Sequence, residues 1–170
     1  YENVMAAVAM TVKAGVPLDI IVRVLKAFKG VEHRIEFVRE LDGVTYYNDS
    51  KGTNPDSSIK ALEAMTKPTL IIAGGYDKHS EFDGFIDAFG GKVKLMVLIG
   101  TTAPQIEKTA RAHGFDDIIN TDSLENAVQI CHDKAVSGDV GLLSPACASW
   151  DMFKSYEERG RLFKEYVNRF

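Results

Sequence analysis

The sequence predicts an α/β fold with a Rossmann-like, mostly parallel β-sheet, helices on both faces and an N-terminal antiparallel hairpin. Short apolar runs of strand type alternate with segments of helical periodicity over most of the chain. The runs at 69–73 and 94–99 are continuously apolar, which is typical of strands buried on both faces of a parallel sheet. Such alternation implies right-handed crossovers between parallel strands.

Two helices are expected before this alternating region. The first, at 2–14, carries valines four residues apart on one face, and the second begins at Pro17. The chain starts inside a helical pattern, without a methionine or a capping residue. We therefore expect residues 1–30 to be the end of a truncated domain and residues 31–170 to form a second domain.

The antiparallel hairpin is predicted at the start of the second domain. Two extended runs, at 35–40 and 44–48, flank the pair Asp42-Gly43. Asp-Gly between such runs is a strong hairpin signal, because both residues tolerate the positive φ angles of a tight turn. The hairpin should add an antiparallel edge to the parallel sheet.

The rest of the chain continues the alternation of strands and helices. The charged positions between 154 and 161, Arg159 among them, are interpreted as the solvated face of a C-terminal helix. The expected helices are at 55–65, 80–89, 103–113, 123–135 and about 150–169, and the expected strands are at 69–73, 94–99, 117–120 and 139–143.

Composition argues against several classes of partner. The net charge is -4 and no run of Lys or Arg is long enough to track a nucleic acid backbone. No apolar run approaches the roughly 20 residues of a membrane span, and no signal peptide is recognisable, so we expect a cytoplasmic protein. Cys131 and Cys147 lack metal-ligand spacing and are interpreted as free thiols, Cys131 in the core.

Three polar loops follow predicted strands, at 48–54, 74–79 and 144–150. Parallel strands place such loops at one edge of the sheet, where α/β proteins bind ligands. The first loop combines Lys51 with hydroxyl side chains, the second has two glycines and Lys78, and the third is rich in small residues and hydroxyls. Two separated cations favour a small molecule with two acidic groups.

Each loop also has an ordinary structural interpretation. Asn54 and Pro55 are typical of a helix N-cap and N1, two glycines often form a turn, and Ser149 resembles a helix cap. Because all three loops should meet at one edge, we favour a binding site. Neither a Walker A nor a Gly-x-Gly-x-x-Gly pattern is present, so the main phosphate loop for any nucleotide would lie elsewhere.

Four motifs, in this order and spacing, resemble the C-terminal part of the Mur ligases, the amide ligases of peptidoglycan precursor synthesis. The resemblance is nearest to the members that add D-glutamate, and it makes residues 1–30 similar to the end of an ATP-binding central domain. The motifs are His33-Arg34-Ile35-Glu36, Asn48-Asp49-Ser50-Lys51-Gly52-Thr53-Asn54, Gly74-Gly75-Tyr76-Asp77-Lys78 and Leu143-Ser144-Pro145-Ala146-Cys147-Ala148-Ser149.

The resemblance implies an ATP-dependent ligase, active as a monomer, with D-glutamate, ATP and UDP-N-acetylmuramoyl-L-alanine as its small-molecule partners. ATP would phosphorylate the alanyl carboxylate, and the amine of D-glutamate would then displace phosphate. The main sites for ATP and Mg²⁺ would lie in the central domain, so the segment alone should be inactive, with no metal ligand and no catalytic group beyond those that position substrate.

The resemblance also implies site residues. Those for D-glutamate are Lys51, Thr53, Lys78, Ser149, Trp150 and Tyr156. Those for the nucleotide are Asn3, Arg34 and Asp49. Two other interpretations stay open: a sibling Mur ligase or a folylpolyglutamate-type ligase that uses another amino acid, and a non-catalytic α/β module that binds an anion.

Overall fold

The computed structural model describes residues 2–28, 30–76 and 79–170, and the chain divides into two compact units, Tyr1–Val31 and Glu32–Phe170. The first unit contains helices α1 (Glu2–Lys13) and α2 (Leu18–Ala27). Its apolar side chains remain largely exposed, with Met5 and Met10 each 67% accessible. That this unit ends an ATP-binding domain stays a prediction.

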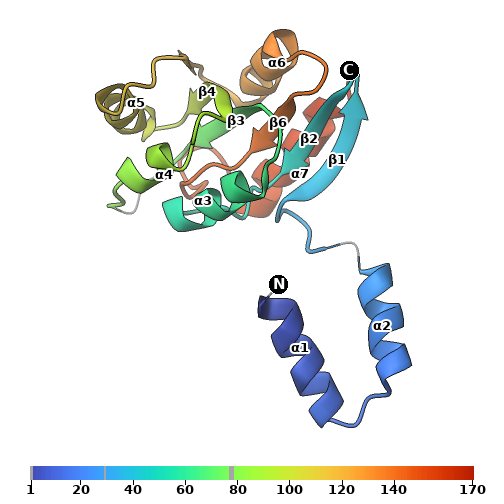
Figure 1. Cartoon of the computed structure of the whole chain (residues 1–170). Coiled ribbons are helices and arrows are strands. Elements are labelled where there is room, and N and C mark those ends of the chain that lie inside the picture. Colours follow the sequence, from blue (N-terminus) through green and yellow to red (C-terminus); the bar gives the residue numbers. More distant parts are fainter. Residues whose placement is uncertain (1, 29, 77–78) are drawn as a thin grey trace. The chain divides into compact units, whose positions relative to one another are not determined.

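The second unit is built on a six-stranded sheet with the strand order β1-β2-β6-β3-β4-β5 (Figure 1). Strand β1 pairs with β2 in antiparallel fashion, and every other pairing in the described sheet is parallel. The predicted fold class is therefore confirmed. The strands are β1 (Glu36–Leu41), β2 (Val44–Asn48), β3 (Thr69–Gly74), β4 (Val93–Ile99), β5 (Ile118–Asn120) and β6 (Val140–Leu143).

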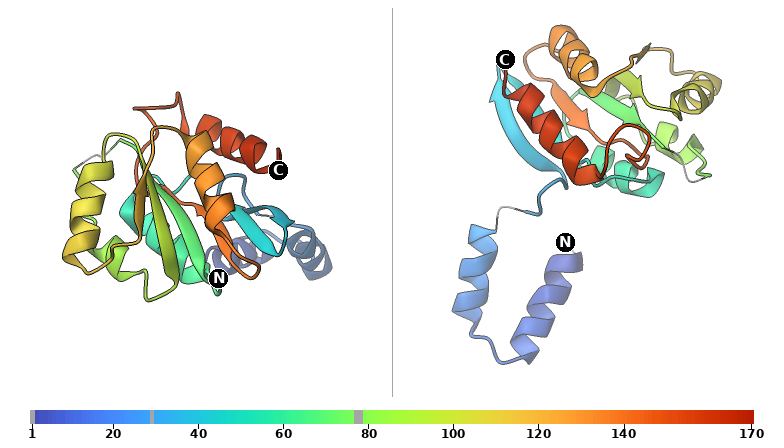
Figure 2. Two further views of the ribbon diagram at one scale, coloured as in Figure 1. Left: turned by 90° about the horizontal axis from the view of Figure 1, so that it is seen from above. Right: turned by 180° about the vertical axis from the view of Figure 1, so that it is seen from behind.

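Helices cover both faces of this sheet (Figures 1 and 2). Successive side chains of a strand point to opposite faces, so Ile71 packs with the α3, α4 and α5 layer, whereas Ile72 packs with α6 and α7. Both side chains are at most 1% exposed, which explains the continuous apolar run of β3. The helices are α3 (Pro55–Ala64), α4 (Asp83–Asp87), α5 (Ala103–Ala112), α6 (Leu124–Lys134) and α7 (Tyr156–Val167).

The hairpin turn forms as the sequence predicts. Leu41 pairs with Val44, and the two residues between them have positive φ, 50° at Asp42 and 79° at Gly43. These are the conformations that a tight two-residue hairpin requires, and Asp and Gly accept them most readily.

Two predicted helices differ from those observed. The helix expected at 80–89 is the shorter α4, and the helix expected from about 150 begins only at Tyr156. Residues 150–155 instead form turns, because the Ser149 carbonyl accepts hydrogen bonds from the backbone N–H groups of Met152 and Phe153. Ser155, and not Ser149, caps α7 through its hydroxyl, which accepts from Glu158 N. None of the described helices is long and apolar enough to cross a membrane.

Candidate functional site

The loops that follow β2, β3 and β6 meet at one edge of the sheet, as predicted. Asp49 N donates to the Leu143 carbonyl at 2.7 Å, which joins the first loop to the end of β6. Tyr76 and Ala148 exchange two backbone hydrogen bonds of 2.9 Å each, which join the second loop to the third. Gly75 permits this approach, since its φ is +135° and a Cβ would collide with the Ala148 carbonyl.

The side chain of Arg159 is fully buried, and its guanidinium contacts both the first and the third loop. Its Nε donates to Ser50 Oγ at 3.0 Å and its Nη2 to the Ser50 carbonyl at 2.9 Å. Its Nη1 and Nη2 also donate to the Cys147 carbonyl at 3.2 Å, and Nη1 donates to the Ala148 carbonyl at 3.4 Å. Burial lowers the pKa of Arg159 to about 10, so the side chain stays charged at neutral pH.

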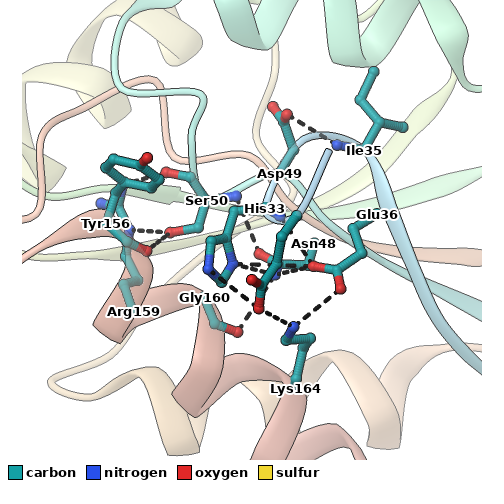
Figure 3. Close-up of polar contacts among 11 residues, drawn as sticks. His33, Ile35, Glu36, Asn48, Asp49, Ser50, Tyr156, Arg159, Gly160 and Lys164 are labelled. Carbon is teal, nitrogen blue, oxygen red and sulfur yellow. Dashed lines mark hydrogen bonds and ion pairs between the residues drawn. The ribbon is translucent and has the colours of Figure 1, made fainter. Parts of the chain in front are cut away.

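Asp49 is directed into the domain and only 2% exposed. Its Oδ1 accepts a hydrogen bond from Ile35 N at 3.2 Å (Figure 3). Its Oδ2 accepts one from Ser144 Oγ at 2.8 Å. Burial raises the pKa of this carboxyl group to about 6, although the hydrogen bonds from Ser144 and Ile35 act in the opposite direction. Asp49 thus joins the start of β1, the first loop and the end of β6.

A buried amide, Asn48, connects the segment before β1 with α7 (Figure 3). Asn48 Nδ2 lies 2.9 Å from His33 Nδ1 and donates to Glu36 Oε2 at 3.0 Å. The His33 carbonyl in turn accepts from Lys51 N at 3.0 Å. Gly160 leaves room for the imidazole, because a Cβ there would collide with His33 Nδ1. Burial lowers the pKa of His33, which favours the neutral imidazole.

Glu32, His33 and Glu36 place three potential metal-ligand atoms within 4.8 Å of one another. The ammonium group of Lys164 already contacts both carboxylates, at 2.8 Å from Glu32 Oε1 and 3.0 Å from Glu36 Oε1. The negative charge of this cluster is therefore paired with a side chain of the protein.

A pocket of about 330 Å³ opens beside the convergent loops. Its lining residues come from the first loop, the third loop and the start of α7, and they are Thr53, Ala148, Ser149, Trp150, Ser155, Tyr156 and Glu157. Lys51 lies next to it, with Nζ at 5.5 Å from the centroid of the Tyr156 ring. The pocket therefore combines hydroxyl groups, the carboxylate of Glu157, a nearby cation and two aromatic side chains.

The structure thus brings together most of the residues predicted to bind D-glutamate. Thr53, Ser149, Trp150 and Tyr156 line the pocket and Lys51 adjoins it. Lys78 lies outside the described residues, so its predicted role is not addressed. That any of these side chains binds an amino acid stays a prediction.

The residues predicted to touch the nucleotide occupy different environments. Arg34 is exposed on the second unit, and Asn3 is exposed on the first unit. Asp49 is buried, and both of its carboxylate oxygens accept hydrogen bonds within the domain. The nucleotide contacts of all three stay predictions.

The interpretation of Arg159 as part of a solvated face was wrong. The helical period could have revealed this, because Arg159, Phe163 and Val167 are four residues apart and all three are at most 1% exposed. The ordinary interpretation of Asn54 was right, since its Oδ1 caps α3 by accepting from Ser57 N at 2.9 Å. Cys131 is buried in the core as expected, and burial raises its pKa to about 12.

Comparison with known proteins gives a consistent family match. The family described as Mur ligase, glutamate ligase domain, matches residues 33–147. The chain is 61% identical over 168 residues to the UDP-N-acetylmuramoylalanine–D-glutamate ligase of Lachnospira eligens, covering 99% of this chain and 37% of that protein. The chain therefore spans little more than a third of the length of this relative.

Two solved structures share the fold. A UDP-N-acetylmuramate-alanine ligase from Thermotoga maritima superposes with a TM-score of 0.72 at 16% identity, covering 98% of this chain and 37% of that one. A bifunctional folylpolyglutamate synthase/dihydrofolate synthase from Yersinia pestis gives a TM-score of 0.69 at 14% identity, covering 95% and 37%. At such identities these two matches establish the fold alone.

Proposed function

This chain belongs to the Mur ligase family, and from that premise we propose that it is the amino-acid-binding part of an ATP-dependent ligase. The reaction proposed for the whole protein joins D-glutamate to UDP-N-acetylmuramoyl-L-alanine. The whole protein would act as a cytoplasmic monomer in peptidoglycan precursor synthesis. Residues 1–30 would then end the ATP-binding central domain, and residues 31–170 would form the amino-acid-binding domain.

The observation that carries this proposal is the composition of the 330 Å³ pocket. Four residues that the family resemblance implies for D-glutamate line this single cavity: Thr53 comes from the first loop, and Ser149, Trp150 and Tyr156 come from one short segment near the C-terminus. Their meeting depends on the parallel order of β2 and β6, which brings the loops after these strands together. The meeting of Thr53 with the 149–156 segment in one pocket supports the proposal.

The chemistry of the pocket suits an amino acid with an acidic side chain. In the proposed complex Lys51 and Thr53 hold one carboxylate of D-glutamate, and Lys78 holds the other. Trp150 and Tyr156 supply apolar surface for the two methylene groups. Fixing the amino acid in this way would place its amine for attack on the activated carboxyl group, so the contribution to catalysis is mainly proximity and orientation.

The same proposal assigns ATP and Mg²⁺ mainly to a part of the protein outside this chain. Among the residues described here, the exposed Arg34 fits a phosphate contact because its guanidinium is accessible. Asn3 and Asp49 remain the other proposed nucleotide contacts, and Asp49 would first have to exchange a hydrogen bond that it makes within the domain. When bound, Mg²⁺ would neutralise phosphate charge.

A substrate panel with the full-length protein tests the proposal. Phosphate release would be measured with ATP, Mg²⁺, UDP-N-acetylmuramoyl-L-alanine and, in turn, D-glutamate, L-glutamate, L-alanine and L-lysine. We expect clear preference for D-glutamate. Preference for another amino acid would support a sibling ligase, turnover of a folate substrate would support a folylpolyglutamate-type ligase, and absence of all ligation would support an anion-binding module.

The isolated chain offers a second, independent test. Trp150 is the single tryptophan of the sequence and lines the pocket, so its fluorescence should report occupancy. We expect D-glutamate to change the emission of residues 1–170, with a weaker response in Lys51→Ala, and no ligation by this segment. Lys108→Ala, which changes an exposed lysine of α5, is the matched control.

A further inference from the structure

Arg159 is among the largest fully buried side chains of the described residues, and it contacts the chain on two sides of the pocket. On one side its acceptors belong to Ser50, the residue before Lys51. On the other side they belong to Cys147 and Ala148, directly before Ser149. The guanidinium therefore bridges the first and third loops at the points where the pocket residues begin.

Helix α7, which carries Arg159 and lines the pocket together with the first and third loops, is also connected to Ser50. Tyr156 lines the pocket and lies one helical turn before Arg159 on α7. The hydroxyl of Ser50, which accepts from Arg159 Nε, donates to the Tyr156 carbonyl at 2.7 Å (Figure 3). One side chain and one hydroxyl thus connect both loops and the helix that together enclose the cavity.

Burying the charged guanidinium of Arg159 costs free energy, so its role extends beyond filling volume in the core. Among the described residues, the hydrogen-bond acceptors of Arg159 are three backbone carbonyls and one hydroxyl, and Asp49 and Asp151 act on it only through space. A buried charge without a directly bonded carboxylate is expensive, and an apolar side chain would fill the same volume more cheaply. Only the planar guanidinium supplies a rigid fork of donors that reaches both loops at once.

We propose that Arg159 is a positioning residue for the amino acid substrate, which fixes the separation between the Thr53 side and the Ser149–Trp150 side of the pocket. The inference rests on the proposed function and extends it to a residue that does not line the cavity. Loss of the fork would let the two loops separate, and the amino acid would lose simultaneous contact with both. Displacements of about 1 Å in such sites cost up to roughly 10²-fold in rate.

The test compares Arg159→Met, Arg159→Lys and Ser50→Ala in the full-length protein, with Arg169→Met as the matched control. Arg169 lies just beyond the same helix, and its side chain is 51% exposed. For Arg159→Met we expect the KM for D-glutamate to rise roughly 10- to 100-fold, while the KM values for ATP and the uridine nucleotide stay within about twofold. Arg159→Lys should recover part of the loss, because an ammonium group cannot bond both loops equally.

The measurements separate positioning from folding. Thermal unfolding and the KM for each substrate are recorded for every variant, and a folded variant with unchanged D-glutamate KM, or with equal changes in all three KM values, would overturn the inference. If neither Arg159 variant folds, Ser50→Ala decides, since it removes one acceptor and should still raise the D-glutamate KM several-fold. A wild-type protein without D-glutamate-dependent turnover would instead refute the proposed function itself.

Discussion

The centre of the sheet and its loop-bearing edge both contain side chains that are almost inaccessible to solvent, but those at the centre are apolar and most of those at the edge are polar. At the centre, Ile72 and Leu142 are at most 1% exposed and contact apolar neighbours in the two helix layers. At the edge, Ala146 and Cys147 are each 1% exposed, but most of the side chains exposed by 2% or less are polar or charged, and they include Asn48, Asp49, Ser50 and Arg159. The centre therefore depends on packing, whereas the edge depends on satisfying each buried polar group.

This difference determines what each region contributes. Apolar packing at the centre stabilises the domain without regard to direction, because the hydrophobic effect has no preferred geometry. Hydrogen bonds at the edge are directional, and they fix the relative positions of loops whose residues line the pocket. We therefore expect substitutions at the centre to change stability, and substitutions in the pocket or in the long-range network of the edge to change ligand affinity. Two residues of the edge should instead change stability: Asp49 through pH, and Asn54 through its local helix cap.

Ile72→Ala should give the largest effect and would break the comparison if it impaired binding. Removing most of a side chain that is 1% exposed creates a cavity, and we expect a loss of about 2–5 kcal/mol in the free energy of unfolding. Urea denaturation measures this loss, and the D-glutamate KM of the folded fraction should stay within about twofold. Val136→Ala, at a side chain that is 59% exposed, is the control and should change stability by less than about 0.5 kcal/mol.

The same difference explains how much of the molecule the sequence predicts. The strands and the hairpin follow from local patterns, since an apolar run or an Asp-Gly pair determines its own structure within a few residues. The contacts of the edge join residues far apart in the chain, such as Ser50 with Arg159 and Asp49 with Ser144. No local pattern encodes such pairs.

Among the site residues, the sequence supplied the identities but not the arrangement. Lys51 and Thr53 are predicted site residues because the motif around them resembles a known family, whereas the pocket that Thr53 lines exists only in the folded domain. Arg159 was missed because its neighbours in the sequence are charged, although its spacing from Phe163 placed it on the buried stripe of α7. Charge alone was therefore a poor guide to exposure.

Asp49→Asn tests the edge by its dependence on pH. The folded-state pKa of Asp49, about 6, lies above the ordinary value of 3.8, so the folded protein binds this proton more tightly than the unfolded chain. The resulting stabilisation is present below about pH 4 and is lost as the pH rises through about 6. We expect the free energy of unfolding to fall between pH 4 and pH 7 by about 2–3 kcal/mol more in the wild type than in Asp49→Asn.

Urea denaturation of both proteins at several pH values makes this measurement. Asn cannot ionise, and its amide oxygen can still accept from Ile35 N, so the variant should keep the fold. Identical pH profiles for the two proteins would contradict the assignment of the raised pKa to Asp49. Ser144→Ala provides a further check, since loss of the hydrogen bond to Asp49 Oδ2 should raise the pKa of Asp49 further.

Lys51→Ala tests whether the edge governs affinity without governing stability. The side chain is only partly buried, and its loss removes a charge-assisted contact to the proposed carboxylate worth roughly 1.5–3 kcal/mol. Converted from free energy to a ratio of binding constants, this loss corresponds to a 10- to 150-fold rise in the D-glutamate KM, and we expect little change in the unfolding temperature. Steady-state kinetics of the full-length protein measure it, with Lys108→Ala as the control. An unaltered KM and kcat would remove Lys51 from the site.

Asn54→Ala should give the smallest effect, and it sharpens the comparison because it changes a local contact within the edge. Asn54 caps α3 through Ser57 N, and a lost N-cap typically costs about 1 kcal/mol of stability. The pocket residue Thr53 directly precedes it, but the first loop is also held by Ser50 and Asp49, so its position should persist. We expect reduced stability with the D-glutamate KM within about twofold, and recovery of stability in Asn54→Ser. A large rise in KM would mean that the local cap, and not the long-range network around Arg159, sets the position of the loop.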